Sequence, residues 1–275
     1  MAEYINKYAN DAAIQAAVDG GELIKPYVAY DEAENRIDWN SKLSPNDKPF
    51  TVEIISGSTF SIGGKSTYAP TVPFYYKHNN DEWQVSSART TLSVAAGDVI
   101  SIKGNGIKNY FLSGDPYFGA GNKTVQFKVY GNVMSLLDAD NYASLTALTN
   151  GQHFKNMFTD CSGLTDASKL ILPATTLTTG CYQQMFAGCT SLTLAPELPA
   201  SILVGNCYYS MFDNTKITYI KCLATDISAT SCTYCWLGSG MYPPMSSGTI
   251  VTPSTTNWPS GLSGIPSGWT RVNSD

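Results

Sequence analysis

The stretch CYQQMFAGCTSLTLAPELPASIL, residues 181–203, is the best-formed copy of a repeat that decides the fold. A less regular copy, HFKNMFTDCSGLTDASKLILPATTL, spans residues 153–177, and a shortened copy, CYYSMFDNTKITYIKCLATDI, spans 207–227. The copies carry Met-Phe pairs at Met157/Phe158, Met185/Phe186 and Met211/Phe212. A spacing of 28 and then 26 residues predicts a solenoid, in which stacked units bury the apolar faces that none could bury alone.

Within one copy, the apolar spacing predicts a short helix followed by a short strand. Thr178 or Thr179 can cap two helical turns over CYQQMF, and Gly188 would end them. The Tyr, Met and Phe of that motif fall at i, i+3 and i+4, which would place them on one buried helix face. The following SLTL is expected to be a strand.

The cysteines recur at fixed places in the repeat. One column holds His153, Cys181, Cys207 and Cys232, and a second holds Cys161 and Cys189. Such columns predict small buried hydrophobic side chains in a ladder, rather than disulfides or metal ligands. Cys232 and Cys235 have the spacing of half a zinc site, but a structural zinc site needs four ligands and no second CxxC exists.

Composition and pattern divide the chain into four segments. Residues 1–45 have too few apolar side chains to fold alone, which predicts an anchor or oligomerisation element. Residues 46–133 predict a β-sandwich, and residues 134–244 the repeats with an N-terminal cap at helical spacing. Residues 245–275 predict a last strand and a Pro/Ser/Gly-rich tail. The expected fold class is therefore mixed and β-rich, with a short N-terminal helix/hairpin element, an antiparallel β-sandwich and a short α/β solenoid.

Short alternating or β-branched runs predict the strands. In the sandwich these runs are residues 50–55, 59–62, 74–77, 82–85, 91–94, 99–103 and 124–130. In the N-terminal element we expect a helix over residues 12–18 and extended pieces at 23–30 and 36–39. Near the C-terminus we expect a strand at 248–251 and a tail held by Trp258 and Trp269.

The charge balance excludes some classes of partner. Charged residues make up only 14% of the chain and the net charge is −5, so no basic stripe is present to bind nucleic acid. No run of about 18 apolar residues occurs, so no membrane insertion is expected. The first residues also lack the basic and apolar regions of a signal peptide, which predicts a protein made in the cytoplasm.

We find no constellation that predicts catalysis. His78 lies in the polar run KHNND and His153 in a cysteine column, and neither has a nucleophile and acid in a recognisable context. The half-motif GGKS at residues 63–66 lacks the first glycine of a phosphate-binding loop and a following helical pattern. The sequence therefore predicts a protein that is not an enzyme, with no catalytic residues, no cofactor and no metal.

Aromatic residues concentrate in the last copies of the repeat. By column, Tyr208 and Trp236 are expected in the core. The remaining candidates for surface contact are Tyr209, Tyr219, Tyr234 and Tyr242. Rigid aromatic side chains suit contact with sugar rings or protein pockets.

The motif in residues 181–203 resembles the BspA-like leucine-rich repeats, whose units have the form C-Y-x-x-M-F-x-G-C-x-S-L-T-x-A-P-x-L-P-A-x-x-L. The flanking copies match in part, since Thr215 replaces the second cysteine in the third copy and the Ala-Pro is lost in both. GIPSGWT at residues 264–270 is also similar to the usual end of such arrays. The resemblance covers about residues 134–275 and implies a leucine-rich-repeat solenoid used in surface adhesion.

The opening MAEYINKYANDAAIQAAVDGGELIKPYVAY resembles the start of virion proteins from tailed phages of Bacteroides-type gut hosts, including the crAss-like group. This resemblance implies a head or tail fibre exposed on the particle, a homotrimer joined to other virion proteins through residues 1–45. Its partner would be a host surface glycan or protein. The alternatives are a bacterial surface adhesin whose export signal is missing from this chain and, at lower weight, a glycan-active enzyme.

Overall fold

The computed structural model describes residues 45–63, 74–86, 89–104, 118, 122–238 and 247–274, together with the backbone of 29–30 and 36–37. The chain divides into two compact units, Met1–Ser44 and Pro45–Asp275. The described part of the first unit is an antiparallel pair, β1 (Ala29–Tyr30) with β2 (Arg36–Ile37). These strands fall within the two predicted extended pieces, whereas the helix expected at 12–18 lies outside the described residues.

The second unit begins with two antiparallel layers. Its first elements are η1 (Pro45–Asp47), β3 (Phe50–Ser56), β4 (Thr59–Gly63), β5 (Tyr75–His78), β6 (Gln84–Val85), β7 (Arg89–Ser93), β8 (Val99–Lys103) and β9 (Gln126–Asn132). One layer is a six-stranded sheet of order β10-β9-β3-β8-β5-β6, antiparallel except where β10 (Leu164–Ile171) pairs with β9 in parallel, and the other pairs β4 with β7. Each predicted run in this segment overlaps a strand, and the ends differ by up to two residues.

Aromatic side chains hold these two layers together. Along β8 alternate residues are buried, as expected for a strand with one face on a core, and on β3 Phe50, Val52 and Ile54 face the core while Thr51 is also buried. Phe60 of β4 and Phe127 of β9 meet edge to face, with ring centroids 5.2 Å apart. The two sheets therefore share an interior, and the β-rich class predicted from the sequence is present.

Beyond β9 the strands pair in parallel. The later elements are η2 (Val133–Leu136), η3 (Tyr142–Ser144), β10 (Leu164–Ile171), β11 (Tyr219–Lys221), β12 (Gly248–Thr252) and β13 (Trp269–Asn273). β10 pairs with β9, and β12 lies between β11 and β13. Single parallel bridges, Asp166 to Leu194 and Leu198 to Cys222, connect residues 192–198 of the best-formed copy to its neighbours.

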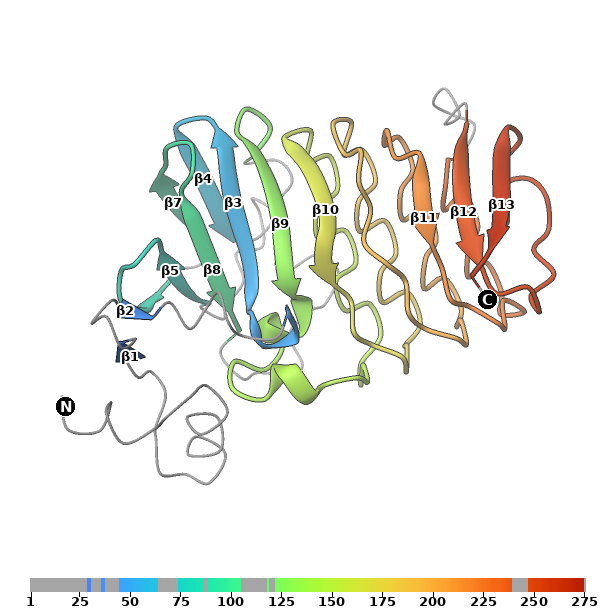
Figure 1. Cartoon of the computed structure of the whole chain (residues 1–275), viewed down its shortest axis with the longest axis horizontal. Helices are drawn as coiled ribbons and strands as arrows, with labels where there is room; N and C mark the ends of the chain where they lie inside the picture. Colours follow the sequence, from blue (N-terminus) through green and yellow to red (C-terminus); the bar gives the residue numbers. More distant parts are fainter. Residues whose placement is uncertain are drawn as a thin grey trace. The chain divides into compact units, whose positions relative to one another are not determined.

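We call this row of strands, β9 and β10, residues 192–198, then β11 to β13, the strand wall (Figure 1). Because β9 precedes residue 133 and β10 follows it, the sheet continues across the boundary expected there between sandwich and repeats. β12 confirms the strand predicted at 248–251.

The helix predicted over CYQQMF is wrong. Among the described residues the helical segments are the three short 3-10 turns η1, η2 and η3. In CYQQMF, alternate N–H groups close β-turns: that of Gln183 donates to Gly180 O at 3.2 Å and that of Met185 to Tyr182 O at 3.1 Å. The N–H groups between them donate to the next copy, since that of Tyr182 bonds Cys207 O at 3.0 Å. Half of the backbone hydrogen bonds of this segment therefore join one copy to the next, whereas in an α-helix all of them would lie within the helix.

Every fourth residue of this turn pattern has a φ angle in the left-handed region. The positions are Gln152, Asn156 and Asp160, then Gly180, Gln184 and Gly188, then Asn206, Ser210 and Asn214, and finally Ser231 and Cys235. Their φ values lie between 48° and 74°, where Gly, Asn and Asp are favoured. Phe154 shares this conformation outside the pattern. We call residues 152–161, 180–189, 206–214 and 231–238 the turn wall.

A file of stacked phenylalanine rings runs through the interior of the second unit. From Phe60 it continues through Phe118, Phe158, Phe186 and Phe212, with successive centroids 6.1, 5.5, 5.4 and 5.3 Å apart. The Phe118 N–H donates to Met157 O at 2.8 Å, as the Phe158 N–H does to Met185 O at 2.8 Å. Phe118 therefore occupies the Phe position of a copy that precedes residue 153, which the Met-Phe spacing did not reveal.

Two tryptophans pack together near the C-terminal end of the repeats. Residues 231–238 form a fourth copy, in which Trp236 takes the Met position, because the Phe212 N–H donates to Trp236 O at 2.8 Å as the Phe186 N–H does to Met211 O at 2.9 Å. The ring of Trp236 stacks on that of Trp258, with centroids 5.1 Å apart. Its Nε1–H donates to Gly264 O at 2.7 Å. Trp258 and Trp269 are both buried, so the prediction that they hold the tail is confirmed.

Candidate recognition surface

The seven cysteines are free thiols and all are buried. Cys189 Sγ donates to Phe158 O at 3.1 Å, and Cys161 Sγ donates to Phe118 O at 3.4 Å, so each thiol bonds the copy before it. Burial raises the pKa of Cys161 to about 12 and holds the pKa of Cys189 well above the ordinary thiol value. The predicted columns of buried small side chains are confirmed, and thiols in this state are poor nucleophiles.

His153 replaces cysteine at the start of its column. Its side chain is buried, and Nε2 accepts a hydrogen bond from the Asn150 N–H at 3.2 Å. Burial lowers the pKa of His153, which favours the neutral ring at pH 7. Within the described part of the chain, no group of three or more His, Cys, Asp or Glu side chains is placed to hold a metal ion.

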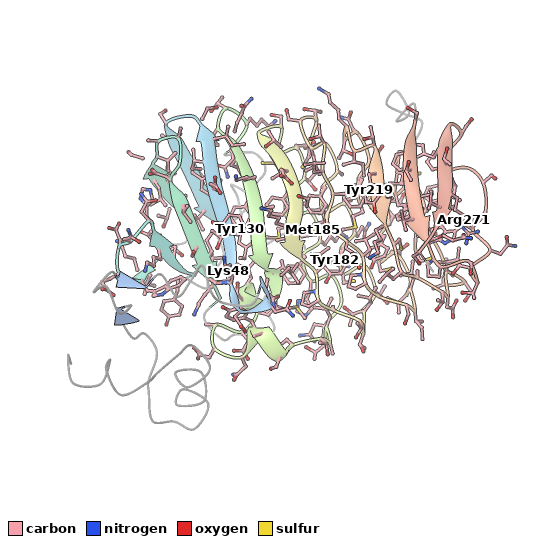
Figure 2. The ribbon with its side chains drawn as sticks, in the orientation of Figure 1. Lys48, Tyr130, Tyr182, Met185, Tyr219 and Arg271 are labelled. Atoms are coloured by element: carbon pink, nitrogen blue, oxygen red, sulfur yellow. The ribbon has the colours of Figure 1, made fainter. Side chains whose placement is uncertain are left out.

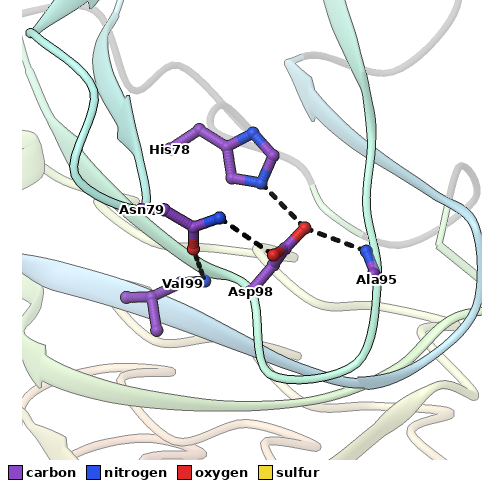
Figure 3. A network of polar contacts seen from close by, with 5 residues as sticks. All are labelled: His78, Asn79, Ala95, Asp98 and Val99. Carbon is purple, nitrogen blue, oxygen red and sulfur yellow. Dashed lines mark hydrogen bonds and ion pairs between the residues drawn. The ribbon is translucent and has the colours of Figure 1, made fainter.

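His78 belongs to a polar network between two turns (Figure 3). Asp98 Oδ2 lies 2.9 Å from His78 Nε2 and accepts the Ala95 N–H at 2.9 Å, while Oδ1 accepts the Asn79 amide at 2.9 Å. The Asn79 amide, then the Ala95 N–H and His78, lower the pKa of Asp98 to about 2. The turn after β5 is thus fixed to the turn before β8, and Asn79 Oδ1 completes the link by accepting the Val99 N–H at 2.8 Å.

The turn wall aligns one outward residue from each copy. The N–H groups of Asn156, Gln184, Ser210 and Cys235 donate to the carbonyls of Gln183, Tyr209, Tyr234 and Leu262, at 3.0, 2.8, 2.9 and 2.8 Å. Because the same backbone hydrogen bond recurs between successive copies, the residues at this position of each copy lie side by side. We call the resulting row the outer column, and its members are Lys155, Gln183, Tyr209, Tyr234 and Leu262.

Two of the predicted contact residues meet in the outer column. The rings of Tyr209 and Tyr234 lie 5.5 Å apart at 33°, and Tyr234 is 40% exposed while Tyr209 is half-buried. Leu262, 46% exposed, extends the apolar surface by one copy. Sequence reasoning missed Leu262 because the repeat motif has disappeared by that point in the chain.

The other predicted contact residues lie elsewhere. Tyr219 is 49% exposed on β11, where its neighbour Ile220 is buried, so Tyr219 faces outward from the strand wall (Figure 2). Tyr242 lies outside the described residues. Tyr208 and Trp236 are buried in the core, as their columns predict.

The outward side of the strand wall differs in character from the turn wall. Tyr219 is aligned with Thr249, which is aligned in turn with Thr270. One row away, Lys221 Nζ and a Glu197 carboxylate oxygen form an ion pair at 3.0 Å. The structure therefore separates the candidate tyrosines into a pair on the turn wall and a single residue on the strand wall.

Comparison of this chain with protein-family models, curated proteins and solved structures gave no match. The resemblance to BspA-like repeats and to phage virion proteins thus stays a prediction based on the residues quoted above. None of the described helical segments is long and apolar enough to cross a membrane.

Proposed function

We propose that this protein is a non-enzymatic phage virion protein, a head or tail fibre. In this proposal residues 1–45 attach it to other virion proteins, and the second unit displays a BspA-like repeat module to host surface molecules. Such a fibre is a homotrimer exposed on the particle, and it contacts a host glycan or protein.

The observation that carries the proposal is the single core of the second unit. Rings from Phe60 to Phe212 follow one another without a break, so antiparallel strands and repeats share one interior. Parallel pairing of successive copies supports a solenoid, although turns replace the helices of the α/β kind that the sequence predicted. A close-packed core of this kind resists deformation, as a display element requires.

The positions of the reactive side chains support a non-enzymatic role. The seven cysteines are buried, Cys161 and Cys189 donate to the copies before them, and His153 is buried as an acceptor. The exposed ring of Tyr234, beside that of Tyr209, instead offers contact area.

Mass spectrometry of phage particles purified from a producing culture tests the location. We expect peptides of this chain at a stoichiometry fixed relative to the capsid protein. Recovery only from the envelope fraction of uninfected cells would favour the bacterial adhesin instead.

Light scattering tests the anchor. We expect the full chain to be a trimer, and we expect a chain that begins at residue 46 to be a monomer with an unchanged far-ultraviolet spectrum. A full-length monomer, or a trimer that survives the deletion, would exclude residues 1–45 as the trimerisation element.

A further inference from the structure

We infer that the turn wall binds a neutral, extended polysaccharide, with the sugar chain running along the outer column past Tyr209, Tyr234 and Leu262. This inference rests on the proposed function, since it assigns the host ligand class and the surface that contacts it. Of the two host ligand classes, glycan and protein, the inference specifies a glycan. Of the two walls, it assigns the contact to the turn wall.

The first argument is charge. Beside the outer column run two flanking rows, one formed by Asn156, Gln184, Ser210 and Cys235 and the other by Gln152, Gly180, Asn206 and Ser231. Ser210, Cys235 and Gly180 are buried, so the accessible polar side chains of these rows are those of Gln152, Asn156, Gln184, Asn206 and Ser231. Among these described positions and the outer column, only Lys155 is charged, and it lies in the copy farthest from Leu262. The two carboxylates of the turn wall, Asp160 and Asp213, lie in other rows. A surface of amides, hydroxyls and aromatic rings matches a ligand that is itself uncharged and rich in hydroxyl groups.

The second argument is the direction in which polarity changes. The outer column begins with Lys155 and Gln183 and ends with Tyr209, Tyr234 and Leu262. Ring edges and aliphatic groups can cover the apolar C–H faces of sugars, while the tyrosine hydroxyls donate to or accept from sugar hydroxyls. The amides of Gln183 and Asn206 adjoin this apolar part and add donors and acceptors in the neighbouring positions.

The third argument is the repeat distance. Backbone hydrogen bonds between copies, such as that from the Ser210 N–H to Tyr234 O at 2.9 Å, space the copies like strands of a sheet, about 4.8 Å apart. An extended chain of β-linked hexoses advances by a similar distance per sugar. Successive sugars can therefore contact equivalent positions of successive copies. The surface of a folded protein ligand would match the spacing of the copies only at isolated points.

The strand wall mixes its exposed apolar side chains, those of Leu194, Tyr219 and Val272, with the charged pair Glu197–Lys221. Its exposed tyrosine, Tyr219, is aligned with threonines on β12 and β13, and the adjacent row holds the Glu197–Lys221 ion pair. Tyr219 and Tyr234 are nearly equally exposed, at 49% and 40%, so Tyr219 provides a matched control for the effect of removing a surface tyrosine.

Biolayer interferometry tests the inference with the full chain and immobilised polysaccharides. The neutral probes are a β-1,4-mannan, a β-1,4-xylan, a β-1,3-glucan and dextran, and the acidic probes are alginate and hyaluronan. We expect binding to at least one β-linked neutral polysaccharide and weaker or no binding to the acidic ones. The double variant Tyr209→Ser/Tyr234→Ser should lower the affinity at least about tenfold, as loss of a central aromatic contact does. Leu262→Ser should lower it by a smaller factor.

The control variant Tyr219→Ser should bind within about twofold of the parent chain, because isolated surface changes have small effects. Unchanged thermal unfolding and far-ultraviolet spectra of each variant would separate lost binding from lost folding, and Tyr234→Ser alone replaces the double variant if Tyr209→Ser unfolds the chain. No binding to any neutral probe, preference for an acidic probe, or loss of binding on Tyr219→Ser would each overturn the inference. The virion proposal would survive those outcomes, because particle composition tests it independently.

Discussion

The antiparallel region before β10 and the repeat stack after it both bury apolar side chains in one core, but their backbone hydrogen bonds follow different patterns. In the antiparallel region, neighbouring strands come from distant parts of the chain, and polar side chains such as Asp98 fix the turns between them. In the stack, each copy bonds the next through its own backbone, and Cys189 and Cys161 add the same thiol bond to the preceding copy.

Phe118 shows how the two regions are joined. Its N–H bonds Met157 O as the repeat requires, while its ring contacts Phe50 of β3 at 5.4 Å and Phe60 of β4 at 6.1 Å. Phe118 thus has the backbone hydrogen bond of the repeats and packs its ring in the core of the antiparallel region. The comparison teaches that a change in strand pairing is not by itself a domain boundary.

Removal of a ring from the phenylalanine file should have the largest effect. Phe186→Ala deletes a fully buried ring that stacks on Phe158 and Phe212, and we expect it to lower the free energy of unfolding by about 3–5 kcal/mol. Phe60→Ala should cost a similar amount on the antiparallel side. In denaturant titrations, each variant should shift one common transition, and a split into two transitions after Phe186→Ala would mean that the regions unfold separately.

A side chain at a left-handed position should have the next largest effect. Gly188 has φ of 74°, and a Cβ there would lie 2.4 Å from Asp160 Oδ1 and 3.2 Å from the Asp160 backbone. We expect Gly188→Ala to destabilise the chain by about 1–2 kcal/mol, because the strained backbone and the close approach both oppose it. The exposed Gly97, with φ of 90° and open space around its Cβ position, offers a control for strain alone. Equal losses of stability on Gly188→Ala and Gly97→Ala would show that the close approach to the neighbouring copy adds nothing to the cost at Gly188.

The Asp98 network should matter less, and its effect should depend on pH. Since the pKa of Asp98 in the folded protein, about 2, lies below its ordinary value of 3.8, the carboxylate stabilises the fold above about pH 4. That contribution disappears as the pH falls through 2. Asp98→Asn cannot ionise, so it should cost about 1 kcal/mol at pH 7 and progressively less between pH 4 and 2. Thermal unfolding of both proteins across this range measures the difference, and parallel curves would contradict the assignment.

The smallest effect should be a gain in stability. The Tyr182 hydroxyl is buried and has no hydrogen-bond partner among the described residues, while its ring stacks on Phe154 at 5.8 Å. Because Phe already occupies this position in the preceding copy, we expect Tyr182→Phe to stabilise the chain by up to about 1 kcal/mol. Tyr209→Phe, at the half-buried outer column, should change stability by less. A loss of stability on Tyr182→Phe would mean that the hydroxyl is bonded in solution.

The sequence predicts the antiparallel strands well because their burial alternates. Val52 and Ile54 of β3 alternate with residues of the other face, and this period of two identifies a strand directly. The turn wall could not be recognised in this way, since Tyr182, Met185 and Phe186 have the spacing of a helix face although they occupy a chain of turns. A better signal was available in the small or polar residues at every fourth position, such as Gly180, Gln184 and Gly188, which tolerate positive φ.

The candidate surface was predicted in part. The repeat columns predicted Tyr208 and Trp236 in the core and left Tyr209 and Tyr234 as surface candidates. In the structure Tyr208 and Trp236 are buried, Tyr209 is half-buried and Tyr234 is exposed. The columns could not show that Tyr209 and Tyr234 touch while Tyr219 lies on the strand wall, because spacing within a copy does not say which side of the core a segment covers. Leu262 joins the outer column only through a backbone bond, for which the sequence contains no motif.

Native-state hydrogen exchange followed by mass spectrometry tests most directly whether antiparallel strands and repeats form one cooperative core. The relevant peptides cover β3, in the antiparallel region, and residues 206–214, in the turn wall of the third copy. With increasing denaturant, we predict that the slowest amides of both peptides converge on one opening free energy, that of global unfolding. Opening of residues 206–214 at a free energy more than about 2 kcal/mol below that of β3 throughout the titration would contradict a shared core.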